Sequence, residues 1–180
     1  SQIWVKSDTP SSLYHTDDAG TDFRINGTTV TSELAASGTT MTITGIPAGV
    51  TKVDILLEGL STDSSSEWLL QIGDSGGIET SGYTSVSGRA ISSGTDTSTS
   101  GYIFTFGVAA GDTRDGILQL RLSDATNNTW IFAGQHCDNG STDVNFGAGA
   151  KSLSGVLDRI MLLNESADDW DAGTIALQYS

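Results

Sequence analysis

Apolar and polar side chains alternate along most of the chain after residue 38, with the period of two that is typical of a β-strand with one buried face. Residues 51–60 (TKVDILLEGL), for example, place Val53, Ile55 and Leu57 on one face. Six further segments show the same alternation or a short apolar run: 67–73, 101–108, 116–123, 129–134, 155–163 and 173–179. We therefore expect about eight strands, separated by turns rich in Gly, Ser, Thr and Asp.

This pattern predicts an all-β protein, an antiparallel β-sandwich of jelly-roll type over residues 39–180. No segment has a sustained helical period, and residues 32–36 (SELAA) could form at most one helical turn. Residues 87–101 are low in apolar side chains, so we expect a mobile loop there.

The first 38 residues differ from the rest and are expected to form an N-terminal arm. Asn26-Gly27 lies between β-forming residues, which predicts a hairpin with a type I′ turn. The arm is too short to build a core of its own, so its apolar side chains should be buried against a neighbouring subunit or a larger particle. The residues expected at this docking or oligomer interface are Ile3, Trp4, Val5, Leu13 and Tyr14.

Composition narrows the classes of partner. The 180 residues include 22 acidic and 8 basic side chains, and the net charge of −14 argues against a nucleic-acid partner. No apolar run approaches the roughly 20 residues that span a bilayer, so membrane insertion is not expected. The single cysteine, Cys137, excludes an intramolecular disulfide and a thiolate zinc cluster.

The motif GDSGG at residues 73–77 is the one that surrounds the nucleophilic serine of chymotrypsin-like proteases. Such an enzyme needs a histidine and an aspartate that precede the serine in the chain. Only 74 residues precede Ser75, His15 lies in the irregular N-terminal part, and His136 comes after the serine. We interpret the motif as a tight turn after a strand and expect no catalysis at Ser75.

Other combinations of reactive residues are also explained without catalysis. His136 and Cys137 are adjacent, so in a strand they point to opposite faces and cannot form a thiol dyad. Paired carboxylates could serve a glycosidase, but aromatic residues are only 7% of the chain and would not line a groove. Residues 124–128 (DATNN) and 138–143 (DNGSTD) offer oxygen atoms that suit Ca²⁺, which leaves a calcium ion possible and no other cofactor expected.

The tryptophans separate into core and surface candidates. Trp68 and Trp130 lie in strand-like runs and are expected in the core. Trp170 lies among acidic residues at the edge of an element, where an exposed ring could stack on a sugar. The expected glycan-binding set comprises three aromatic residues and three hydrogen-bonding neighbours: Trp170, Tyr83, Tyr102, Asp169, Asp171 and Asn164.

Residues 42–88, from TITGIPAG to YTSVSG, resemble a C-terminal module of phage tail-fibre-like and other virion proteins. SGYIFTFG (100–107), NTW (128–130) and the segment 151–179 also match. The resemblance implies a non-enzymatic β-sandwich appendage of a virion, assembled in the host cytoplasm. It further implies contacts with other virion proteins, a homotrimer, and attachment to the host surface, where polysaccharide is the expected ligand. Because no long shaft precedes the module, a capsid decoration or head-fibre protein that stabilises the particle remains the alternative.

Overall fold

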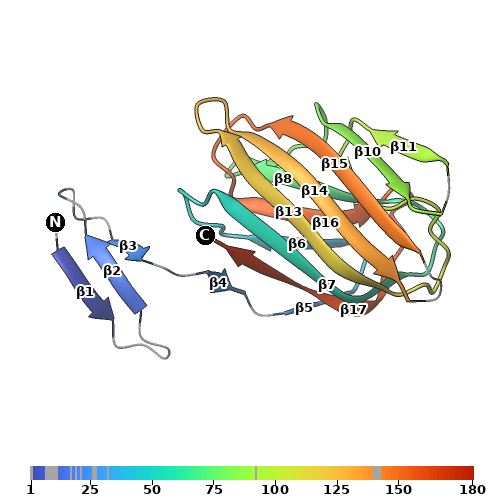
Figure 1. Cartoon of the computed structure of the whole chain (residues 1–180), viewed down its shortest axis with the longest axis horizontal. Coiled ribbons are helices and arrows are strands. Elements are labelled where there is room, and N and C mark those ends of the chain that lie inside the picture. Colours follow the sequence, from blue (N-terminus) through green and yellow to red (C-terminus); the bar gives the residue numbers. More distant parts are fainter. Residues whose placement is uncertain are drawn as a thin grey trace.

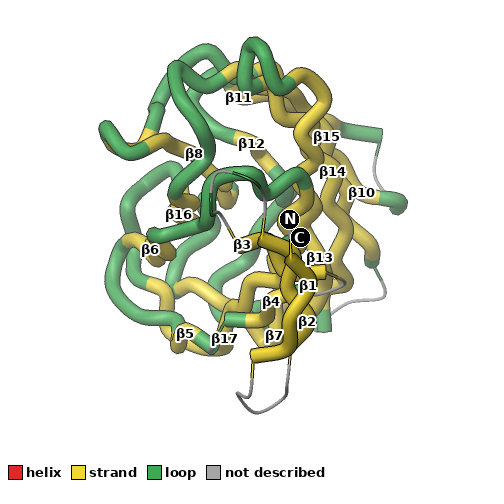
Figure 2. Tube along the Cα trace, turned by 90° about the vertical axis from the view of Figure 1, so that its left-hand side faces the viewer, coloured by secondary structure: helices red, strands yellow, loops and turns green. Residues whose placement is uncertain are grey.

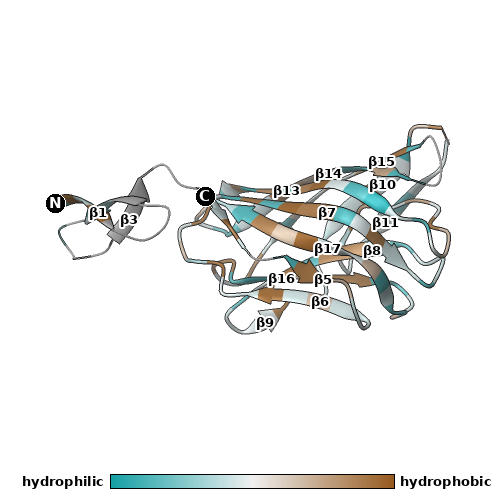
Figure 3. Ribbon diagram, turned by 90° about the horizontal axis from the view of Figure 1, so that it is seen from below, coloured by the Kyte–Doolittle hydropathy of each residue, from teal (hydrophilic) through white to brown (hydrophobic). Residues whose placement is uncertain are grey.

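The computed structural model describes residues 2–6, 12–16, 18, 20, 22–25, 28–31, 33–91, 93–139 and 143–180. Within these residues all regular structure is β, and every strand pair is antiparallel (Figures 1 and 2). Two sheets pack against each other as layers, which Figure 3 shows from the side. The predicted all-β antiparallel sandwich is confirmed.

The larger sheet has nine strands. Its main path has the order β11-β10-β15-β14-β13-β7-β17-β4, and β5 also pairs with β17. The strands are β4 (Thr29–Val30), β5 (Leu34–Ala35), β7 (Lys52–Thr62), β10 (Thr84–Arg89), β11 (Thr95–Ser98), β13 (Arg114–Asp124), β14 (Thr129–Asp138), β15 (Val144–Ser152) and β17 (Trp170–Tyr179).

The smaller sheet covers the inner face of the larger one. It has the order β12-β8-β16-β6, and β9 pairs with β8. The strands are β6 (Thr40–Thr44), β8 (Trp68–Asp74), β9 (Gly77–Ile78), β12 (Tyr102–Ile103) and β16 (Arg159–Asn164).

The core lies between the two sheets and follows the predicted alternation. Val53, Ile55 and Leu57 of β7 are buried, as are Leu118 and Leu120 of β13. Each of these strands therefore turns one apolar face inward, where burial of apolar surface provides the main stabilisation.

The N-terminal part forms a small sheet of its own. Strands β1 (Gln2–Lys6), β2 (Ser12–Thr16) and β3 (Asp22–Ile25) pair in that order. Figure 1 shows this sheet apart from the sandwich, on the side of the C-terminus. We call it the arm sheet.

The predicted hairpin on either side of Asn26-Gly27 is wrong. Strand β3 pairs with β2 of the arm sheet, whereas β4 pairs with β17 of the sandwich. Residues 26–27 themselves lie outside the described residues. Pairing with the sandwich thus begins at Thr29, within the range expected to be the arm, because the free edge of β17 offers β4 and β5 a hydrogen-bonding partner.

Two further segments differ from expectation. Residues 87–101, expected to be a loop, contain the end of β10 and all of β11, which form a hairpin at the edge of the large sheet. Residues 32–36 contain β5 instead of a helical turn. In residues 87–101 backbone pairing with β10 compensates for the lack of apolar side chains, whereas at β5 pairing with β17 is joined by packing of Leu34 and Ala36 against the core.

Candidate functional site: the outer face of the large sheet

The outer face of the large sheet carries many apolar side chains. On β14, the outward Ile131, Ala133 and Gln135 alternate with the buried Trp130 and Phe132. Antiparallel sheets with one solvated face usually place polar side chains there. Over residues 129–137 this strand instead presents apolar or uncharged side chains on both sides.

The strand register places the smallest outward side chains next to one another. Ala133 of β14 lies opposite Ala148 of β15, which in turn lies opposite Val86 of β10. On the other side Ala133 lies opposite Gln119 of β13. The middle of the outer face is therefore a shallow depression surrounded by larger side chains.

Large hydrophobic side chains are exposed around these alanines. Nine large hydrophobic residues are exposed among the described residues, and four of them lie on this face: Val86, Ile131, Val144 and Phe146, at 41%, 43%, 46% and 50%. Such a concentration on a few adjacent strands distinguishes an interaction surface from single scattered apolar residues.

Phe146 is the most exposed of the four. The Phe146 ring lies over Gly88 of β10, since a Cβ atom placed on that glycine would stand 3.4 Å from the ring. The ring thus covers bare backbone on one side, as aromatic residues often do opposite a strand glycine. Half of the side chain remains open to solvent.

No outward side chain of β10, β15 or β14 carries a charge, although the chain has a net charge of −14. We call these positions the neutral face: Thr84, Val86, Gly88, Thr129, Ile131, Ala133, Gln135, Cys137, Val144, Phe146, Ala148, Ala150 and Ser152.

Charged groups begin beside the neutral face, on β13 and β7. Asp54 accepts hydrogen bonds from Arg121 and Gln119, both at 3.1 Å, and forms an ion pair with Lys52 at 2.7 Å. Burial raises the pKa of Asp54, but the hydrogen bonds from Lys52, Arg121 and Gln119 outweigh it, so this pKa lies below its usual range. The Asp54 carboxylate thus links side chains of β7 and β13 at this border of the face.

A second fixed carboxylate lies at the other end of β13. Asp115 accepts hydrogen bonds from the side chain of Asn139 and from the backbone N–H of Gly59, both at 2.6 Å. The bond from Asn139, followed by that from Gly59, lowers the pKa of Asp115.

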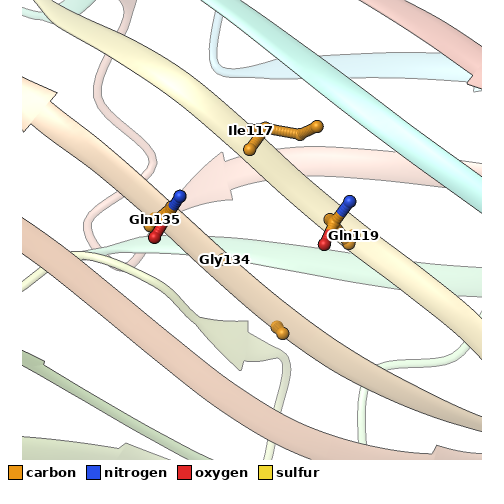
Figure 4. Close-up of a pocket in the computed structure, with 5 residues that line it drawn as sticks. Ile117, Gln119, Gly134 and Gln135 are labelled. Atoms are coloured by element: carbon orange, nitrogen blue, oxygen red, sulfur yellow. The ribbon is translucent and has the colours of Figure 1, made fainter.

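Three shallow hollows lie on this side of the sheet. The first, of about 170 Å³, has Ile117, Gln119 and Gln135 in its lining, and Figure 4 shows them on β13 and β14. The second, of about 350 Å³, lies beside Cys137 and Val144. The third, of about 370 Å³, is lined by Thr84, Ser85, Val86, Thr97, Ala148, Gly149 and Ala150.

The expected sugar-stacking platform is wrong. Trp170, Tyr83 and Tyr102 are at most 2% exposed, and Asn164 is buried as well. Asp169 and Asp171 are exposed but have no exposed ring of this set beside them. The Trp170 ring belongs to the core because β17 starts inside the sandwich at this residue, so acidic neighbours in sequence do not mark a surface ring.

Each of these buried groups has a structural role. The ring of Trp170 packs edge-on against Trp68, with centroids 4.8 Å apart. The Tyr83 hydroxyl donates to the carbonyl of Glu79 at 2.8 Å, and the Tyr102 hydroxyl donates to the carbonyl of Trp130 at 3.0 Å. Trp68 and Trp130 are fully buried, which confirms their predicted place in the core.

Asn164 organises the loop that leads into β17. Its side-chain oxygen accepts hydrogen bonds from the backbone N–H groups of Ser166 and Asp168, and its Nδ2 donates to the carbonyl of Asp168. The amide is therefore used within its own loop.

The arm sheet has two different faces. Ile3 and Val5 of β1 are 65% and 62% exposed. Trp4, which points the other way, stacks on Tyr14 with centroids 5.0 Å apart and donates from Nε1 to Thr16 Oγ1. The fifth expected interface residue, Leu13, lies opposite Val5 in the register, and its side chain is outside the described part. The docking role of these five residues stays a prediction.

The GDSGG motif forms a turn, as predicted. Strand β8 ends at Asp74 and β9 begins at Gly77, so Ser75 lies in the connection of a two-residue hairpin. His136 is buried, with its Nε2 atom 3.0 Å from the carbonyl oxygen of Phe104, whereas Cys137 is exposed. The two residues point to opposite faces, which confirms the prediction against a dyad.

The carboxylates of the two loops considered for calcium have protein partners. Asp124 accepts hydrogen bonds from Thr126 and Asn127 of its own turn. In the second loop, Asp138 lies 3.6 Å from Arg114, and Asp143 lies 3.3 Å from Arg89. Within the described ranges, no three His, Cys, Asp or Glu side chains gather in a way that suits a metal ion.

Sequence reasoning missed the neutral face. The available signal was the run VNFGAGAKS (144–152), in which Val144, Phe146, Ala148 and Ala150 share one face and the polar Asn145 and Lys151 share the other. Such a run predicts a strand but does not indicate which side is covered.

Comparisons with protein-family models, with curated proteins and with solved structures found no match. The described residues also contain no helix that is long and apolar enough to cross a membrane. Function has therefore to be inferred from the surfaces of the molecule itself.

Proposed function

We propose that this chain is a non-enzymatic structural protein that works by assembly, as the β-sandwich head of a virion appendage or as a decoration protein. The observation that carries the proposal is the neutral face, where three adjacent strands expose apolar side chains and no charge. Exposed patches of this kind mark protein-binding surfaces. The resemblance to phage tail-fibre-like proteins supports a virion as the assembled particle.

The arm sheet provides a second argument for the same function. Its exposed Ile3 and Val5 are not paired with any strand of the sandwich, whose strands pair only among themselves in the described residues. Three strands this short are too small to bury an apolar core of their own, so the exposed Ile3 and Val5 favour a partner surface. We propose that the arm docks on another protein of the particle, which gives the chain two separate contacts.

Attachment to a host polysaccharide is the second candidate, and we propose that it would use the outer face. The half-exposed ring of Phe146 lies opposite Gln135 in the register, and Gln119 lines a hollow beside it. An aromatic ring with nearby amide groups is the chemistry that recognises a sugar. Only one such ring lies on the neutral face, so protein assembly is the better-supported function.

Particle incorporation tests the proposal. Tagged full-length chain is expressed in host cells while the particle assembles, and purified particles are probed for the tag. We expect the wild type to be present and Phe146→Asp to be reduced about tenfold or more, because a buried carboxylate is not tolerated in an apolar contact. The control is Val156→Asp, since Val156 is 54% exposed but lies between β15 and β16, outside the neutral face.

The results separate the candidates. Absence of the wild-type chain from purified particles overturns the proposal. Normal incorporation of Phe146→Asp, together with loss of binding to host polysaccharide, favours attachment instead.

A further inference from the structure

We infer that the partner covering the neutral face is a second copy of this chain. The inference rests on the proposed function, because it takes the neutral face to be a protein-binding surface. It goes further by naming the occupant.

The size of the surface fits a contact between two copies. Strands β13, β14 and β15 have 11, 10 and 9 residues, so the face is about 30 Å long at ~3.4 Å per residue. With β10 added, the three strands of the neutral face and the bordering β13 span about 19 Å at ~4.8 Å spacing. The resulting area of roughly 600 Å² approaches the ~800 Å² per partner that a standard stable interface buries.

Charge also favours a second copy. Each copy carries a net charge of −14, so most pairs of surfaces would bring carboxylates together. The neutral face has no charged side chain on β10, β15 or β14. Of the two carboxylates along its border, Asp54 is paired with Lys52 and Arg121, and Asp115, opposite Cys137, accepts hydrogen bonds from Asn139 and Gly59. It is thus a surface on which two such acidic chains can meet without local repulsion.

The shape of the face is suited to pairing with itself. It carries both a half-exposed ring, Phe146, and a hollow lined by Val86, Ala148 and Ala150. In a two-fold contact the same patch serves both partners, so the exposed side of each ring can pack over the hollow of the other copy. The alanine side chains allow the two sheets to approach closely there.

Sedimentation equilibrium of the full chain tests the inference. We expect reversible self-association between about 1 and 100 µM, and an association constant at least about 30-fold lower for Phe146→Asp. The matched control, Val156→Asp, should stay within about threefold of the wild type. Circular dichroism at each concentration checks that all three proteins are folded.

Cys137 provides an independent readout, because this single thiol is exposed on the neutral face. In the presence of a reductant, its alkylation by iodoacetamide should slow by about tenfold or more when the wild type associates. Phe146→Asp should show no such protection at the same concentration. The protection of the wild-type thiol, compared at low and high concentration, does not depend on the stability of a variant.

Several results would overturn the inference: a wild-type chain that stays monomeric, association that Val156→Asp weakens more than Phe146→Asp, or association that leaves Cys137 fully reactive. If the wild type is monomeric and Phe146→Asp still fails to enter the particle, the inference of a second copy is wrong and the proposed function stands. Self-association through the neutral face with normal incorporation of Phe146→Asp retains the inference and overturns the proposed function.

Discussion

Lys151 and Glu79 form an ion pair that joins the two sheets, because Lys151 lies in β15 of the large sheet and Glu79 follows β9 of the small one. The Lys151 side chain is only 7% exposed, and its ammonium group lies 5.5 Å from the ring centre of Tyr83. Glu79 also accepts hydrogen bonds from the backbone and the hydroxyl of Ser154. One carboxylate thus holds together three segments.

We predict that Glu79→Gln lowers the free energy of unfolding by about 2 kcal/mol at pH 7, since it leaves a buried ammonium group without its counter-ion. Burial raises the pKa of Glu79, but the hydrogen bonds from Lys151 and Ser154 outweigh it and lower this pKa below 4.5. The contribution should therefore be complete above about pH 5 and be lost as the pH falls through and below 4.5. Urea unfolding at several pH values measures it.

The exposed Glu58 on β7 provides the control, and Glu58→Gln should change the free energy of unfolding by less than about 0.5 kcal/mol. An equal effect of the two substitutions, or a Glu79→Gln effect that persists unchanged at pH 3, would contradict the role of this ion pair.

His136 should make the fold sensitive to mild acid. Burial lowers the pKa of His136 to about 4, although the carbonyl of Phe104 beside its Nε2 atom acts in the other direction. The folded-state pKa is thus below the unfolded value of about 6.5, so the neutral ring stabilises the fold fully above pH 6.5. As the pH falls from 7 to 4, stability should decrease by on the order of 3 kcal/mol from this residue alone.

The substitution His136→Gln should remove that part of the pH dependence while keeping a polar group near Phe104. The measurement is the difference between the unfolding free energies of wild type and variant at pH 7 and at pH 4.5. His15, in the arm sheet, is the matched control, and His15→Gln should leave the pH profile of the sandwich unchanged. A wild-type profile that is flat between pH 7 and pH 4.5 would show that His136 titrates normally.

The alternation of side chains was enough to predict the sandwich, because burial of one strand face leaves a period-two pattern in the sequence. It identified the inward residues of β7 and β13 as well as Trp68 and Trp130. The same reasoning failed for Asn26-Gly27, since a turn signal reports only local preference. The edge of β17, distant in sequence, decides instead where β4 pairs.

The candidate site could not be predicted for a related reason. Strand β14 has apolar residues on both faces, and β15 has its apolar residues on the outer face with Asn145 and Lys151 on the inner one, so hydrophobicity does not distinguish the core side from the outer side. The prediction of an exposed ring at Trp170 failed for a different reason. The acidic neighbours of Trp170 suggested a surface position, but pairing of its backbone with Thr62 and Gly38 places the start of β17 inside the sandwich.

Trp170 should behave as a core residue. Trp170→Ala removes a ring that is 2% exposed and packs on Trp68, so the free energy of unfolding should fall by about 3–5 kcal/mol. The neighbouring Asp171 is exposed, and Asp171→Ala should change it by less than about 0.5 kcal/mol. Urea unfolding compares the two. A Trp170→Ala protein that is as stable as the wild type but no longer binds host polysaccharide would restore the stacking hypothesis.

Ser75 should not react as a catalytic nucleophile. The residue lies in the β8–β9 turn, where Asp74 fixes the backbone by accepting a hydrogen bond from the N–H of Gly76 at 2.7 Å. The imidazole of His136 is buried against Phe104, and His15 belongs to the arm sheet, so neither histidine has been brought to the Ser75 hydroxyl as a general base.

A fluorophosphonate probe should therefore leave the full-length chain unlabelled under conditions in which a chymotrypsin-like protease is labelled completely. Ser75→Ala should unfold within about 0.5 kcal/mol of the wild type, because the turn depends on Asp74 and the glycines and not on the serine side chain. Stoichiometric labelling that disappears in Ser75→Ala would mean that the hydroxyl is activated by a group the turn geometry does not reveal. It would make the resemblance of GDSGG to a protease motif chemically significant after all.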